Sequence, residues 1–234
     1  MSRAHGEADT AAVAGAFADP ARSAMLWALS DGRALPAGEL ARIAHVSAAT
    51  ASAHLAKLVS SGFVRVDPSG RHRYYRLARP DVVSVLEALA RLAPAPQSLH
   101  ASDSPTGLRL ARTCYDHLAG RAGVRITDGL IDRGYLTEME SGYSVGDEGV
   151  AFFGDLDICV ADLRQHAAAT RRAFARACLD WSERRHHVAG ALGAALCTAL
   201  LRLEWFERLQ GTRALRITSN GRRSVKQVLG VQVL

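Results

Sequence analysis

The feature that most constrains this chain is a segment rich in proline and serine near its middle, at residues 94–107. It contains three prolines and three serines, and it follows neither helical nor strand periodicity. Segments of this kind join domains. Because 234 residues exceed the usual size of one domain, we expect two, each able to bury its own core. The predicted organisation is a first domain at 10–93, a linker at 94–106 and a second domain at 107–234.

The composition favours helices over a large sheet, because 48% of the residues are hydrophobic but only 6% are aromatic. We therefore expect a mainly α protein with small β-hairpins. The formal net charge of +6 suits an anionic partner. Residues 1–10 lack the apolar core of a signal peptide, and no apolar run reaches the roughly 18 residues of a membrane helix. The expected location is the cytoplasm, without a membrane partner, where the four widely spaced cysteines stay as thiols.

The first domain has the pattern of a winged helix-turn-helix. Two consecutive helices are expected within residues 10–30, followed by a short helix at 38–44 and a longer one from 47 to 60. Strand-like residues at 63–66 and 71–77 flank a turn at 67–70, which predicts a hairpin. Residues 81–92 form one amphipathic helix whose wide apolar face needs a partner.

The longer helix carries the side chains expected to contact bases. A helix that enters a major groove about 12 Å wide needs small or polar residues on its exposed face. Ser47 is a suitable N-cap, and Thr50, Ser52 and His54 are the candidates for base or near-base contacts. Lys57 lies a turn further along, where a phosphate is the expected partner.

The hairpin adds a basic wing, since residues 65–79 contain five arginines and one aspartate. Any single arginine could simply belong to a solvated charged surface. The arginines together follow the two helices of the helix-turn-helix pattern, and this coincidence favours binding of double-stranded DNA. The wing residues expected at the DNA are Arg71, His72, Arg73, Tyr75 and Arg76.

The first domain resembles the ArsR/SmtB family of repressors over residues 10–93. Four segments carry the resemblance: ADPAR at 18–22, ELA at 39–41, VSAATASAHL at 46–55 and GRHRYYRL at 70–77. The resemblance implies a homodimer formed through the first and last helices of this domain. It also implies that the protein represses by occupying an operator and is released when an inducer binds. Two features depart from the metal-sensing members: Ala41 and Ile43 replace a Cys-x-Cys pair, and residues 81–92 contain no histidine.

The second domain contains an internal repeat with an offset of 70 residues, at about 114–156 and 184–229. His117-Leu-Ala-Gly in the first copy corresponds to His187-Val-Ala-Gly in the second. Chance similarity among Ala- and Leu-rich helices is the alternative explanation. If the repeat is real, each copy is predicted to be helix, helix, short hairpin, helix, and the domain is a pseudo-repeated, winged-helix-like effector domain.

Cysteine and histidine residues of the two copies suggest a sensing site. Cys114 and His117 are three residues apart, which predicts that they share one face of a helix. Together with Cys178 and His187 they would form a four-ligand site of zinc type, or a soft-metal or redox site. The alternatives are buried cysteines and histidines that only support the fold. A weaker candidate group on one helix consists of Cys159, Asp162 and His166.

An organic inducer is the other possibility, in an aromatic pocket lined by Tyr115, Trp181 and His187. The sequence identifies neither the inducer nor a cofactor. An enzyme is not expected, because residues 107–234 contain no GxGxxG or P-loop motif. The sequence as a whole predicts a DNA-binding transcriptional regulator, a repressor whose C-terminal domain senses the inducer.

Overall fold

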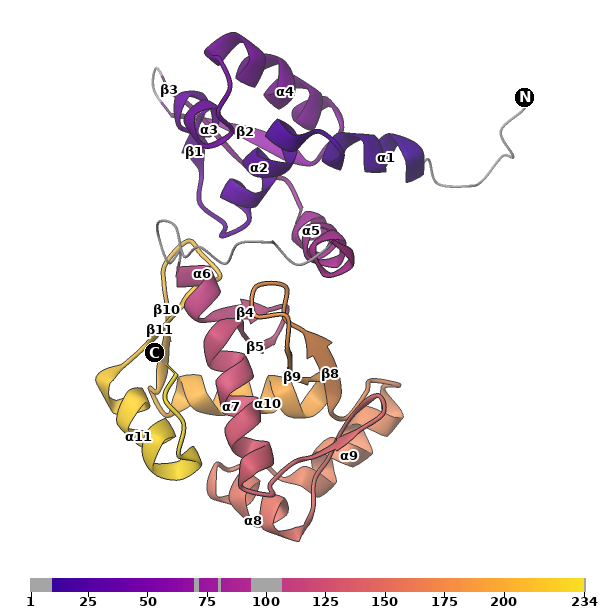
Figure 1. The fold of residues 1–234 in the computed structure, drawn as a ribbon, viewed down its shortest axis with the longest axis vertical. Helices are drawn as coiled ribbons and strands as arrows, with labels where there is room; N and C mark the ends of the chain where they lie inside the picture. Colours follow the sequence, from indigo (N-terminus) through magenta and orange to yellow (C-terminus); the bar gives the residue numbers. More distant parts are fainter. Residues whose placement is uncertain (1–9, 70–71, 80, 94–106, 234) are drawn as a thin grey trace, which may run out of the picture. The chain divides into compact units, whose positions relative to one another are not determined.

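A computed structural model describes residues 10–69, 72–79, 81–93 and 107–233 (Figure 1). The chain divides into two compact units, Met1–Leu92 and Ala93–Leu234. The linker predicted at 94–106 lies outside the described residues. Across the described ranges, every helix is too short or too polar to cross a membrane.

Within its described residues, the first unit contains five helices and a three-stranded antiparallel sheet in the order β1-β3-β2. In chain order its elements are α1 (Thr10–Phe17), α2 (Pro20–Leu29), β1 (Leu35–Pro36), α3 (Ala37–Ile43), α4 (Ala48–Ser60), β2 (Val64–Ser69), β3 (His72–Leu77) and α5 (Asp81–Leu92). This is the predicted order of helices and hairpin, and it confirms the winged helix-turn-helix fold of this unit.

Local signals explain where these helices begin and end. Asp19 caps α2 by accepting a hydrogen bond from the backbone N–H of Arg22, and Pro20 occupies the first helical position. Just beyond α4, Gly62 adopts a φ of +72°, a left-handed conformation that favours glycine and turns the chain into β2. Leu26, Leu40 and Leu55 are among the buried residues that join α2, α3 and α4 in one core.

The second unit repeats one series of elements: hairpin, helix, hairpin, helix. After the short helix α6 (Gly107–Leu110), the first series is β4 (Arg112–Cys114), β5 (His117–Ala119), α7 (Gly120–Asp132), β6 (Thr137–Met139), β7 (Gly142–Ser144) and α8 (Asp147–Asp155). A connecting helix α9 (Val160–Ala169) precedes the second series, which is β8 (Arg176–Leu179), β9 (His186–Ala189), α10 (Gly190–Arg202), β10 (Phe206–Arg208), β11 (Leu215–Ile217) and α11 (Ser219–Leu229).

The start of each series differs from the prediction, because a β-hairpin stands where a helix was expected. His117, Leu118 and Ala119 are all buried, which suits a short strand enclosed on both faces. Gly120 then has a φ of +78° and Gly190 a φ of +80°, so the left-handed backbone ends each strand before its helix begins. The three-residue spacing of Cys114 and His117 therefore reflects a tight hairpin turn and not one face of a helix.

Backbone pairing joins the two halves of the second unit at two places. β7 pairs with β8 of the second series at Gly142 and Arg176, so that β6-β7-β8-β9 is one four-stranded sheet. In the reciprocal position, an isolated bridge joins Arg112 of the first series to Ala214 beside β11. Helix α10 contacts β5, and helix α7 contacts β9. The two series are thus interlocked around a local pseudo-twofold axis.

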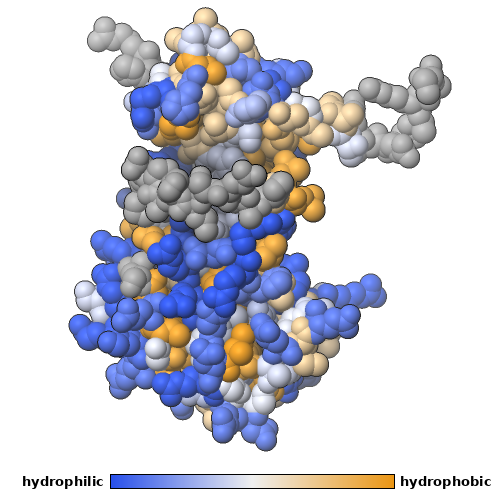
Figure 2. Space-filling model, viewed as in Figure 1, coloured by the Kyte–Doolittle hydropathy of each residue, from blue (hydrophilic) through white to orange (hydrophobic). Residues whose placement is uncertain are grey.

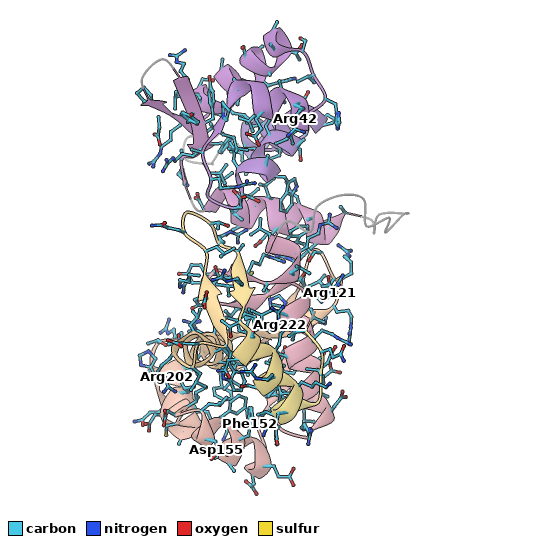
Figure 3. All side chains as sticks on the ribbon, turned by 90° about the vertical axis from the view of Figure 1, so that its left-hand side faces the viewer. Arg42, Arg121, Phe152, Asp155, Arg202 and Arg222 are labelled. Carbon is cyan, nitrogen blue, oxygen red and sulfur yellow. The ribbon has the colours of Figure 1, made fainter. Side chains whose placement is uncertain are left out.

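The core of the second unit is separate from that of the first and lies between its helices and hairpins. Phe152 of α8, labelled in Figure 3, stacks on Tyr135 with ring centroids 4.3 Å apart. The face of this unit drawn in Figure 2 is mostly hydrophilic, with apolar residues between the charged ones.

Candidate functional site

Helix α4 presents the small polar face that the sequence predicts. Its N-cap is Ser47, whose Oγ accepts a hydrogen bond from the backbone N–H of Thr50 at 3.1 Å. Thr50, Ser52 and Lys57 are exposed, whereas the opposite face of the helix is buried in the core. The exposed side chains are short near the N-terminus of the helix, so the backbone there can approach a groove closely.

His54 is more constrained than its neighbours on α4. Its Nδ1 lies 3.4 Å from a guanidinium nitrogen of Arg22, and its Nε2 lies 3.8 Å from Oδ1 of Asp19. The side chain is partly buried against the N-terminus of α2. His54 therefore links α4 to α2, a connection across 32 residues that the sequence pattern did not indicate.

The wing residues fall into groups with different surroundings. Arg73 is exposed, whereas Tyr75 is half-buried and packs against the core of the first unit. Arg76 forms an ion pair with Asp67, with 2.6 Å between its Nε and the carboxylate. Arg71 and the side chain of His72 lie outside the described residues. Of the predicted wing cations described here, Arg73 is the one best exposed for a phosphate contact.

Helix α3 adds a cation that the sequence analysis did not single out. Arg42 occupies its last turn and is exposed (Figure 3). Helix α3 precedes α4 in the helix-turn-helix, and the first helix of this motif crosses the DNA backbone. The signal available in the sequence was a basic residue on the outer face of the short predicted helix.

The first and last helices of this unit expose large apolar side chains. Val13 of α1 and Val85, Leu89 and Leu92 of α5 are exposed, although Val82 and Leu86 of α5 face the core. Exposed apolar residues gathered on two helices indicate an association surface.

In the second unit, the four predicted cysteine and histidine residues come together. Cys114 pairs with His117 across the β4–β5 hairpin, and Cys178 pairs with His187 across the β8–β9 hairpin. One ligand atom from each of the four residues lies within 4.8 Å of all the others. We call this group the cysteine–histidine cluster.

The two histidines meet at the centre of the cluster. Their Nε2 atoms are 3.2 Å apart, and their side chains are almost completely buried. Burial lowers the pKa of His187, with a further lowering by His117, while a hydrogen bond to Cys114 and the charge of Asp180 act in the opposite direction. His187 is therefore held mainly in its neutral form, in which one ring nitrogen has a lone pair available.

A carboxylate stands behind each histidine ring. Nδ1 of His117 lies 3.4 Å from Oδ1 of Asp116, and Nδ1 of His187 lies 3.7 Å from Oδ2 of Asp180. Both hairpins thus carry the same motif, Cys-x-Asp followed across the hairpin by His. These aspartates were not among the predicted site residues, although each stands two residues after a candidate cysteine.

Asp180 is fixed by a buried network. Its Oδ2 accepts hydrogen bonds from Arg112 at 2.9 Å and from the backbone N–H of Gly120 at 2.7 Å, while Oδ1 accepts one from the hydroxyl of Ser182. Burial alone would raise the pKa of Asp180, but Arg112 and these donors outweigh it and hold the pKa below its usual value. The carboxylate is therefore ionised beside His187.

The remaining candidates of the second unit do not gather into a site. Tyr115 occupies the β4–β5 turn and is 90% exposed, so it does not line a pocket. The ring of Trp181 is covered by Arg112, whose guanidinium carbon lies 4.8 Å from the ring centroid. Cys159 and His166 are exposed at the two ends of α9.

Comparison with known proteins agrees with the winged helix-turn-helix class that the first unit defines. A family model described as a helix-turn-helix domain matches residues 17–67. An HTH-type transcriptional regulator of Bacillus subtilis (strain 168), YdfF, is 45% identical over 225 residues, which cover 95% of this chain and 98% of that protein. The chain belongs to this family of HTH-type transcriptional regulators, and its first unit has the winged helix-turn-helix that the resemblance to the ArsR/SmtB regulators implies.

Solved structures are similar to part of the chain as well. The homodimeric winged helix-turn-helix domain of Mb0332 from Mycobacterium bovis is 29% identical, with 38% of this chain and 88% of that chain covered and a TM-score of 0.32. HlyU from Vibrio cholerae is 29% identical, with 36% and 89% covered and a TM-score of 0.33. The repressor BigR from Xylella fastidiosa is 23% identical, with 38% and 89% covered and a TM-score of 0.35.

Proposed function

We propose that this transcriptional regulator binds a double-stranded operator as a homodimer, represses by occupying it, and is released by an inducer that the second unit senses. The observation that carries the DNA-binding part is the exposed face of α4. Its N-terminal turn is capped by Ser47 and offers Thr50 and Ser52 beside alanines, with no bulky side chain to keep the helix out of a major groove.

Within this proposal the phosphate contacts come from cations that flank α4. Arg73 on the wing and Arg42 on α3 are exposed, and Lys57 is exposed towards the end of α4. Arg76 is paired with Asp67 and would contribute less, because the carboxylate already neutralises much of its charge.

The homodimer in this proposal uses the exposed apolar residues of α1 and α5, as the family resemblance implies. A second copy of the same helices would cover Val13, Leu89 and Leu92. Dimerisation would also set two α4 helices about 34 Å apart, the spacing of successive major grooves.

The test uses DNA from upstream of the protein's own gene, measured by fluorescence anisotropy across a salt series. Arg73→Ala should weaken binding to operator and random DNA alike and reduce the salt slope by about one, because wing cations release counterions. Thr50→Ala or Ser52→Ala should instead lower the preference for operator over random DNA. Arg223→Ala in α11 removes the same charge from an exposed position of the second unit and is the control.

The assignment of α4 as the recognition helix would be contradicted if all four variants lost the same affinity for DNA. It would also be contradicted if the wild-type chain showed no preference for its operator. The dimer is tested separately by sedimentation at micromolar concentration. Leu89→Glu should give monomers, whereas Val150→Glu, an equivalent change at an exposed valine of α8, should not.

We further propose that the second unit is regulatory and not catalytic, and that the protein acts in the cytoplasm, where its DNA is found. Support comes from residues 107–234, which contain no GxGxxG or P-loop motif. Their one GxSxG match, at 142–146, places Ser144 in strand β7 paired with Thr137, and not on the sharp strand-to-helix turn of a nucleophile. The experiment is operator release in the presence of candidate inducers, with the full-length chain as the sole protein in the assay.

A further inference from the structure

We propose that Cys114, His117, Cys178 and His187 bind one Zn²⁺-class metal ion on the pseudo-twofold axis of the second unit, and that its occupancy changes operator affinity. The first half of this inference concerns metal binding by the second unit alone. The second half rests on the proposed function, since it names the class of inducer.

The ligand set matches the chemistry of a borderline metal. Two thiolates and two imidazoles are a common ligand set for structural zinc, and carboxylate-loving ions such as Mg²⁺ do not favour it. All four residues lie on short strands that the surrounding core fixes, and none lies on a long loop. The ligands are therefore preorganised by the fold.

The distances fit a tetrahedral ion with little movement. Zn–N bonds of about 2.0–2.1 Å in tetrahedral geometry place two coordinating nitrogens about 3.3 Å apart. The two Nε2 atoms are 3.2 Å apart, and all four ligand atoms lie within 4.8 Å of one another. Because sulfurs bound to one zinc ion lie a little under 4 Å apart at Zn–S distances near 2.3 Å, only a small contraction is needed.

The carboxylates beside the Nδ1 atoms of the two histidines also support a metal site. In metal sites, the ring nitrogen that does not coordinate commonly donates to a carboxylate, which fixes the ring and its tautomer. Asp116 and Asp180 stand at this position behind His117 and His187. Asp116 is itself paired with Arg172 at 2.6 Å, and Asp180 is held by Arg112. With the protons on Nδ1, the lone pairs belong to two Nε2 atoms that lie 3.2 Å apart, an arrangement that a cation between them stabilises.

The packing of the two helices brings the hairpins together. A Cβ added at Gly193 of α10 would lie 3.3 Å from the Cβ of His117, and one added at Gly123 of α7 would lie 3.7 Å from the Cβ of His187. Each series thus places a glycine against the histidine of the other. An ion in the cluster would be bound equally by both series and would hold them to each other.

The experiment uses the full-length chain, purified with a reductant, stripped by a chelator and dialysed against Zn²⁺. Elemental analysis should give one zinc ion per chain, and zinc should raise the melting temperature of the second unit. Titration with Co²⁺ should give the visible bands of a tetrahedral site and a sulfur-to-cobalt charge-transfer band, which report thiolate ligation directly.

Single variants identify the ligands. Stoichiometric zinc binding should be lost in Cys114→Ser, Cys178→Ser and His187→Gln. With cobalt, these variants should lose the charge-transfer band or the visible bands of a tetrahedral site. Cys159→Ser and His166→Gln change the same residue types at exposed positions on α9 and should keep both. Asp116→Asn should retain the ligands but bind zinc roughly 10–100-fold more weakly. Circular dichroism confirms that each variant is folded before its affinity is compared.

Different outcomes overturn the two halves of the inference. The site is refuted if the wild-type chain binds no stoichiometric zinc, or if Cys114→Ser and Cys178→Ser bind it as tightly as the wild type. A mass two daltons lower with no bound metal would identify a redox pair instead. If zinc binds but the affinity for the operator is unchanged, the regulatory half of the inference is wrong. If zinc binds but the protein binds no operator DNA, the proposed function is wrong and the metal site stands.

Discussion

Arg112 and Asp180 form an ion pair that is almost wholly removed from solvent, with side-chain exposures of 1% and 0%. Removal of one partner from such a pair leaves an uncompensated buried charge and typically costs about 3–5 kcal/mol. We expect Arg112→Met to lower the free energy of unfolding of the second unit by this amount in chemical denaturation. Arg121→Met, at an exposed arginine 3.7 Å from Glu183, should change it by less than about 1 kcal/mol. Similar effects of the two variants would contradict this account of the network.

The cysteines outside the cluster should differ sharply in reactivity. Burial raises the pKa of the Cys197 thiol to about 11, whereas Cys159 is an exposed thiol. At pH 8 the fraction of thiolate at Cys197 is therefore very small, and reagents cannot reach it. We expect labelling with a disulfide reagent, followed by mass spectrometry, to modify Cys159 rapidly and Cys197 only after denaturation. Modification of Cys197 in the folded chain would show that α10 opens readily.

At the scale of single residues, the sequence predicts a side chain best when its role is local. Ser47 could be assigned as a cap because the groups it serves are three residues away. The contacts of His54 with Asp19 and Arg22 could not be assigned, since they depend on how α4 packs against α2. For the same reason Tyr75, expected at the DNA, was not recognised as partly a core residue.

At the scale of elements, the tight seating of α7 and α10 on the strands of the second unit depends on glycine. A Cβ at Gly193 would lie 2.5 Å from the carbonyl oxygen of Val188, a contact that only a backbone shift can relieve. We expect Gly193→Ala to destabilise the second unit by about 1–3 kcal/mol, the usual cost of overpacking. Thermal unfolding of the variant gives the measurement.

Gly154 provides the matched control for this substitution. It lies in α8, and an added Cβ would meet nothing within 4 Å. Since alanine is the better helix former by about 1 kcal/mol, Gly154→Ala should stabilise the same unit slightly. If both substitutions stabilise the second unit, the backbone of α10 can shift away from β9 at little cost.

The sequence predicts elements well where caps, turns and periodicity agree, as in the first unit. Residues 81–92 were expected as one helix and form α5 with the same bounds. The first hairpin of each series in the second unit was mistaken for a helix, because three-residue strands provide too few positions for a period of two to appear. The spacing of Cys114 and His117 fits a helix turn and a tight hairpin equally well, so the ligands could be grouped although their geometry was wrong.

At the scale of the whole molecule, the two units have separate cores, and this separation can be tested by truncation. A fragment of residues 1–93 should melt cooperatively and retain operator binding, because α1 to α5 close their own core. It should no longer respond to zinc, since all four cluster residues belong to the second unit. Calorimetry and anisotropy give the two measurements. An insoluble fragment would argue that the units stabilise each other.

The association of the two series in the second unit was the hardest feature to derive from sequence. The offset of 70 residues aligns His117 with His187 but does not align Cys114 with Cys178. The β4–β5 turn has two residues, 115–116, whereas the β8–β9 loop has six, 180–185. The strand register is the same in both hairpins, so the cysteines are equivalent in space although not in linear spacing.

The interlocked sheets give the second unit, within one chain, the architecture of a domain-swapped dimer. β7 completes the sheet of the second series, and the bridge from Arg112 to Ala214 joins the first hairpin to the last. The only covalent link between the two series runs through exposed residues near Arg171, after α9. Cleavage there would leave two polypeptides that each lack a strand partner and half of the metal ligands. Such fragments would reassemble by complementation. Binding of a metal ion, which needs ligands from both fragments, would then indicate that they had reassociated.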